Sequence, residues 1–156
     1  EKRDQLKQKV LEHSASKTEK LSRRELFIAG VALYWAEGFK HVAEGRIGFC
    51  NSDPEMIKFE IKFLEKCLSV SKIELSPRLT LNEAFRDKTE EIQKFWSKYL
   101  QIPPDQFTKP FYQKAKQVKI YENRDNYHGV LRIHVRKSSK LMTQMRGYML
   151  GLKNSL

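Results

Sequence analysis

Apolar residues recur along the chain with two different spacings, and each spacing predicts one kind of element. A nearly unbroken apolar run from Leu26 to Ala36 predicts a helix that is buried on most sides. Ser22 and Glu25 have the spacing of a capping box before this run, and Gly38 follows it as a helix terminator. Helical spacing also predicts helices over 54–68, 87–100 and 139–152. Glu60 interrupts one apolar stripe, and we expect it to lie exposed at the helix edge.

Strict alternation of apolar and polar residues predicts the strands. In 72–83 the apolar set is Leu79 and Leu81, and the polar set is Arg78, Thr80 and Asn82. In 129–137 the apolar set is Leu131, Ile133 and Val135, and the polar set is Arg132, His134 and Arg136. Residues 39–42 and 46–51 resemble a hairpin about 43–45, and 118–121 give a weaker strand signal. The order of elements predicts an α+β fold, an antiparallel sheet with helices packed on one face.

Length and composition narrow the class of protein. The chain has 156 residues, which predicts a single domain over 21–156 after a polar arm or helix over 1–20. No apolar run is long enough to cross a membrane. The two cysteines, Cys50 and Cys67, cannot form a disulfide framework, so we expect a reduced, intracellular (cytoplasmic) protein.

The charge indicates a polyanionic partner. Thirty Lys and Arg residues against 19 Asp and Glu give a formal charge of +11, and nucleic acid is the commonest partner of such a chain. Basic residues with interleaved tyrosines are dense between 109 and 140, although a solvated basic loop would have the same composition. Arg, Asn and Thr side chains pair with base edges and phosphates. The predicted DNA contacts are Arg46, Arg78, Thr80, Asn82, Lys114, Lys116, Lys119, Arg132, His134, Arg136 and Lys137.

Glu37 is an unusual residue for the end of a helix. The helix macrodipole is negative there, so a carboxylate is disfavoured by roughly 0.3–1 kcal/mol. A bound divalent cation would reverse that penalty, whereas a solvated Glu at a frayed end is the simpler interpretation.

The segment Gly30–Gly38, GVALYWAEG, resembles the nine-residue motif of the LAGLIDADG homing endonucleases. Leu33, Ala36 and Gly38 match the motif by identity, and Glu37 stands at its catalytic acid position. Trp35 occupies a position where Asp is common, so the motif is degenerate. The resemblance extends to the order of elements from about 22 to 152, and it implies a LAGLIDADG-like fold with a concave, saddle-shaped sheet.

The resemblance also implies a function. A single motif supplies one acid, so the active unit would be a homodimer whose motif helices pack through Ala29, Ala32, Leu33 and Ala36. Glu37 would bind Mg²⁺ and Lys40 would assist at the site, so that the nuclease hydrolyses double-stranded DNA.

Two other functions remain open at this stage. Trp35 and the degenerate motif favour a regulator that binds DNA without cleaving it, whereas the presence of Glu37 favours the nuclease. RNA binding is the third hypothesis, because the basic, tyrosine-bearing segment permits it.

Overall fold

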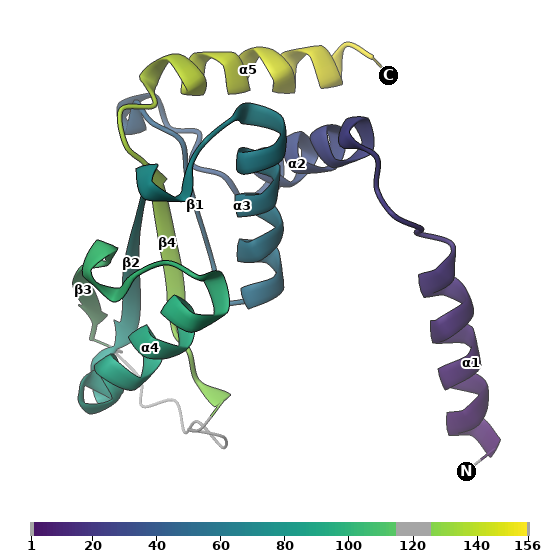
Figure 1. The fold of residues 1–156 in the computed structure, drawn as a ribbon, viewed down its shortest axis with the longest axis horizontal. Coiled ribbons are helices and arrows are strands. Elements are labelled where there is room, and N and C mark those ends of the chain that lie inside the picture. Colours follow the sequence, from purple (N-terminus) through teal and green to yellow (C-terminus); the bar gives the residue numbers. More distant parts are fainter. Residues whose placement is uncertain (1, 115–125, 156) are drawn as a thin grey trace.

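A computed structural model describes residues 2–114 and 126–155, and it has an α+β fold (Figure 1). The α-helices of the described chain are α1 (Lys2–Ser16), α2 (Arg23–Glu37), α3 (Pro54–Leu68), α4 (Thr89–Leu100) and α5 (Ser139–Lys153). The strands are β1 (Gly48–Asn51), β2 (Leu75–Asn82), β3 (Thr108–Gln113) and β4 (Val130–Val135). Short 3₁₀ turns cover Val42–Glu44, Lys72–Glu74, Glu83–Lys88 and Pro104–Gln106. The α+β class expected from the sequence is therefore confirmed.

The strands form one four-stranded sheet in the order β1-β4-β2-β3. β4 pairs antiparallel with both β1 and β2, whereas β3 runs parallel to β2. The expectation of an antiparallel sheet is thus wrong at this edge. The chain passes from β2 through α4 before it enters β3, and such a crossover returns it to the end of the sheet where β2 began.

The sheet has one apolar face and one polar face, as the alternation predicts. Leu79 and Leu81 of β2 and Leu131 and Ile133 of β4 are buried, while the residues between them are half-buried. The apolar strand residues share one core with buried side chains of the helices, among them Ile57, Ile61, Leu64, Ile92, Trp96, Met142 and Met145. The described helices therefore cover the apolar face, and none of them covers the polar face, whose residues in β2 and β4 are half-buried.

The predicted hairpin over 39–51 forms only in part. Gly38 and Phe49 make an isolated bridge, and the N–H of Phe39 donates to the carbonyl of Gly48 at 2.8 Å. Beyond that point a 3₁₀ turn replaces the expected first strand, because the His41 ring accepts a hydrogen bond from the N–H of Ala43. Local side-chain bonds of this kind compete with strand pairing.

Glu60 is buried, contrary to expectation. Its side chain is only 3% exposed, on the face of α3 that also carries Ile57, Ile61 and Leu64. Neither carboxyl oxygen has a hydrogen-bond partner among the described residues. Burial raises the pKa of Glu60 to about 8, because the charged form is poorly solvated there.

α1 stands apart from the rest of the chain in Figure 1. All of its residues are exposed, including Leu6, Val10 and Leu11. It therefore adds nothing to the buried core. Among the described helices, none combines the length and apolarity that a membrane crossing requires.

Candidate nucleic-acid interface

Two arginines lie at the centre of the polar sheet face. Arg78 of β2 and Arg132 of β4 are direct partners in the antiparallel register. Each guanidinium lies over an aromatic ring, Arg132 at 4.2 Å from the Phe39 centroid and Arg78 at 5.4 Å from that of Phe111. Both Nε atoms are buried without a hydrogen-bond partner among the described residues. Like charges directly opposite each other destabilise a sheet, so this pairing favours a role in binding an anion.

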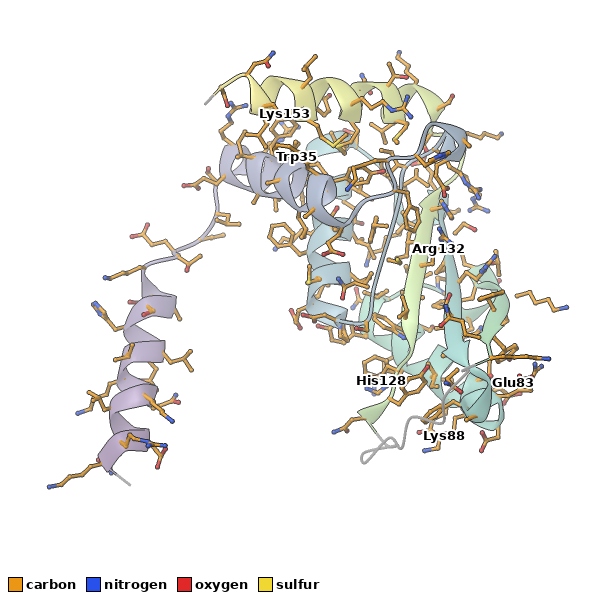
Figure 2. All side chains as sticks on the ribbon, turned by 180° about the vertical axis from the view of Figure 1, so that it is seen from behind. Trp35, Glu83, Lys88, His128, Arg132 and Lys153 are labelled. Carbon is orange, nitrogen blue, oxygen red and sulfur yellow. The ribbon has the colours of Figure 1, made fainter. Side chains whose placement is uncertain are left out.

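A hollow of about 330 Å³ surrounds the two arginines. Its other lining residues are Glu44, Arg46, Ser76, Thr108 and His134. Three guanidinium groups against one carboxylate make the hollow positive, and Figure 2 shows Arg132 midway along β4. Hydroxyl and guanidinium groups at this spacing are suited to phosphate oxygens and to base edges.

Glu44 is the one acidic residue in this lining, and it faces two of the basic groups. Its carboxylate lies 3.8 Å from Nη2 of Arg132 and 3.4 Å from Nε2 of His134. Burial lowers the pKa of His134, the nearby Arg46 lowers it further, and the contact with Glu44 only partly opposes these effects. His134 is therefore neutral at pH 7, so the arginines set the positive charge of the hollow.

A second hollow of about 460 Å³ continues along the sheet towards its far end. Thr80, Asn82 and Gln113 line it with Tyr127 and His128, so it is polar but uncharged. Asn82 also has a structural role, because its Oδ1 accepts from the N–H of Ala84 at 2.9 Å. This hollow offers neutral hydrogen-bonding groups beside the positive one.

His128 is fixed at the margin of this second hollow. Its ring stacks on Phe95 with centroids 3.6 Å apart, and its carbonyl accepts from Nε1 of Trp96 at 2.8 Å. Figure 2 shows His128 where β4 begins, on the same end of the sheet as Glu83. Burial lowers the pKa of His128, so this ring is also neutral at pH 7.

The end of α2 lies beside the polar face. Cys50 of β1 is the register partner of Arg132, and burial raises the pKa of its thiol. Arg132 lowers that pKa and Glu37 raises it, so both charges lie within electrostatic range of the thiol. Glu37 itself is exposed. The end of α2 approaches the central arginine, because Phe39, two residues after Glu37, lies beneath the Arg132 guanidinium.

Lys40 caps the end of α2. Its Nζ donates to the carbonyl of Trp35 at 2.5 Å and to that of Ala36 at 3.2 Å. A cation is the favoured partner of helix C-terminal carbonyls, so Lys40 offsets the unfavourable position of Glu37. The helix macrodipole at Glu37 therefore no longer requires a bound metal ion, because Lys40 supplies the positive charge.

Glu37 suits Mg²⁺ only as a member of a larger set of ligands. Its exposed carboxylate is a hard oxygen donor of the kind that Mg²⁺ takes. The described part of the chain contains no group of three or more His, Cys, Asp or Glu side chains placed to hold a metal ion. Glu37 therefore belongs to no such group within the described residues.

The structure brings some of the predicted DNA contacts together and separates others. Arg46, Arg78, Arg132 and His134 line the positive hollow, and Thr80 and Asn82 line the neutral one. The remaining predicted contacts lie elsewhere. Lys114 is exposed beyond β3, and Lys137 is exposed beyond β4, while Lys116 and Lys119 fall outside the described residues.

Arg136 does not share the hollow with the other arginines. It follows β4, and its guanidinium donates to the carbonyl of Ile73. The contacts predicted from the sequence also omit several residues that line the two hollows, among them Glu44, Ser76, Thr108, Gln113 and His128. Ser76 was detectable, since it stands two residues before Arg78 on the polar face. Thr108 and Gln113 were not, because β3 carries Pro110 and no clear alternation.

The predicted dimer surface on α2 is largely uncovered within one chain. Ala32 and Ala36 are exposed, and Ala29 and Leu33 are half-buried. Trp35 is 40% exposed, and Nζ of Lys153 in α5 lies 5.8 Å from its ring centroid (Figure 2). This face of α2 is therefore open to a partner.

A comparison of the chain with protein-family models, curated proteins and solved structures finds no match.

Proposed function

We propose that this protein binds double-stranded DNA through the polar face of its sheet. The observation that carries the proposal is the opposed pair Arg78 and Arg132, held over aromatic rings in a hollow with Arg46. Guanidinium groups are the commonest specific readers of guanine and also bind phosphates. The neutral hollow with Asn82 and Gln113 extends the contact along the same face.

The proposed active unit is a homodimer of the LAGLIDADG type. The uncovered small residues of α2, Ala32 and Ala36, support close approach of the same helix from a second copy. Such a dimer would align two basic sheet faces along one duplex. It would also bring two copies of Glu37 near the two-fold axis.

Cleavage is the enzymatic part of the proposal. In a dimer the two Glu37 carboxylates would hold Mg²⁺, which supplies activated water and stabilises the leaving oxygen of the phosphodiester. Phe39, two residues after Glu37, lies beneath the Arg132 guanidinium, which supports a position of Glu37 beside the bound backbone.

A DNA-binding regulator without cleavage is the second candidate, and one observation favours it. Lys40, the basic residue expected to assist catalysis, donates to the carbonyls of Trp35 and Ala36 instead of extending towards a substrate.

Plasmid nicking with Mg²⁺ separates the two candidates. The nuclease should nick supercoiled DNA, and Glu37→Gln should abolish nicking while leaving the affinity for DNA unchanged. Equal nicking by Glu37→Gln would refute the assignment of Glu37. If the wild type binds duplex DNA tightly but does not nick it, the protein would be assigned as the DNA-binding regulator.

A further inference from the structure

A hollow with an apolar floor and a basic rim lies where α2 begins and α3 ends. Its volume is about 450 Å³, within the range of roughly 300–1,000 Å³ that is typical of ligand pockets. The floor consists of Leu21, Leu26 and Phe59, and the rim consists of Lys20, Arg23, Lys62 and Lys66. Leu21 is 39% exposed, so part of the floor is open to solvent.

The walls of this hollow are joined by hydrogen bonds, so the shape exists before any partner binds. Nε of Arg23 donates to the carbonyl of Lys66 at 3.2 Å. Sγ of Cys67 contacts the carbonyl of Arg23 at 3.7 Å. A complete capping box between Ser22 and Glu25 fixes the first turn of α2. A preformed hollow loses little conformational entropy on binding.

The rim of the hollow is positively charged. No acidic residue lines the hollow, and no carboxylate of the described residues forms an ion pair with any of the four rim cations. Lys62 and Lys66 lie on the exposed side of α3, whose buried side faces the core beneath the sheet. The hollow is therefore on the helix side of the fold, and the proposed DNA face does not account for it.

We propose that this hollow docks an acidic protein segment that inserts a large apolar side chain. The apolar floor would bury that side chain, and its carboxylates would meet the rim cations. Charge complementarity decides among occupants. The chain's own α1 carries Lys2, Arg3, Lys7 and Lys9 against Asp4 and Glu12, so it would repel the rim. The phosphates of duplex DNA match the rim, but the duplex offers no large apolar side chain to fill the apolar floor.

Fluorescence anisotropy with defined peptides tests the proposal on the full chain. The probe is a short labelled peptide of Asp and Glu with two leucines one helical turn apart. Wild type should bind it saturably, and replacing both leucines by serine should weaken binding about tenfold. Lys62→Glu combined with Lys66→Glu should weaken binding of the leucine peptide by a similar factor or more. Leu21→Ser probes the floor of the hollow and should also weaken binding of the leucine peptide.

Matched controls make each outcome decisive. Lys94→Glu combined with Lys98→Glu changes the charge of α4 by the same amount and should leave peptide binding unchanged. Circular dichroism confirms that each variant is folded, and duplex binding by the rim variant should equal that of wild type. Equal affinity for the leucine and serine peptides would overturn the proposal. A loss of duplex affinity in the rim variant would also overturn the proposal and would assign the hollow to DNA. A loss of self-association of the rim variant in sedimentation would overturn it as well and would assign the hollow to a second copy of the chain.

Discussion

Arg78 and Arg132 stand directly opposite each other on the polar face of the sheet, in adjacent antiparallel strands. The Arg78 guanidinium lies over the Phe111 ring and that of Arg132 over the Phe39 ring, and Glu44 offsets part of the charge of Arg132. An arrangement that costs stability in the free protein becomes favourable once a polyanion lies across both strands.

Arg132→Ala should weaken binding to duplex DNA. Loss of one base or phosphate contact costs about 1–3 kcal/mol, which is at least about fivefold in Kd, and it should reduce the slope of log K against log salt by about 1. A salt titration by fluorescence anisotropy measures both quantities. Lys94→Ala on α4 is the control, and an unchanged affinity and slope for Arg132→Ala would place the DNA surface elsewhere.

Glu44→Gln should strengthen DNA binding. The carboxylate contacts Arg132 and His134 and repels phosphate, and its half-buried ion pair with Arg132 is worth about 1 kcal/mol. Removing it should lower Kd by up to about fivefold, most clearly at low salt. Glu90→Gln, on the exposed side of α4, should have no such effect. Weaker binding by Glu44→Gln would mean that Glu44 orients Arg132 for the DNA.

Ala32→Leu should disrupt the proposed dimer. Ala32 is exposed on α2, and a larger side chain there would keep two copies of the helix from approaching closely. Sedimentation velocity should show monomers for this variant and dimers for wild type. Ala15→Leu makes the same change on the exposed α1 and should not alter the dimer. Intact dimers of Ala32→Leu would exclude this helix face as the contact.

Glu60 should make the free energy of unfolding fall as pH rises. Its pKa is about 8 in the folded protein, against 4.5 for an unperturbed Glu, so the folded state keeps a proton that the unfolded state has lost. Stability should therefore decrease between about pH 4.5 and 8, with a slope of at most about 1.4 kcal/mol per pH unit from this group. Urea unfolding at several pH values measures the slope.

Glu60→Gln is neutral at every pH and should flatten this dependence. Glu90→Gln replaces an exposed carboxylate and should keep the slope of wild type. A Glu60→Gln protein with the same slope as wild type would show that other groups cause the dependence.

Periodicity predicted the parts of this fold that depend on burial. Leu79 and Leu81 point to the core while Arg78 and Thr80 do not, because alternate residues of a strand face opposite sides. Periodicity failed where tertiary contacts decided the outcome. Glu60 follows the buried face of α3 despite its charge, and β3 depends on pairing with β2 more than on its own pattern.

The alternation of residues along the strands also predicted part of the candidate site. The alternation in β2 and β4 correctly predicted Arg78 and Arg132 on the polar face of the sheet, whereas their direct pairing is seen only in the structure. The position of Lys40 could not be predicted, because its role in capping α2 depends on how the chain turns after Gly38. The position of Arg136 outside the positive hollow could not be predicted either, because it depends on a long-range contact with Ile73.

The order of the strands has a consequence for how the chain folds. β4 lies between β1 and β2, yet it is the last strand to be synthesised. Until residues 130–135 emerge from the ribosome, β1 and β2 have no common neighbour and most of the sheet cannot form. Sheet formation therefore waits for long-range contacts that exist only once residues 130–135 have been made. Truncation before β4 would remove one of the two inner strands and leave only the β2–β3 pair, which is marginally stable by itself.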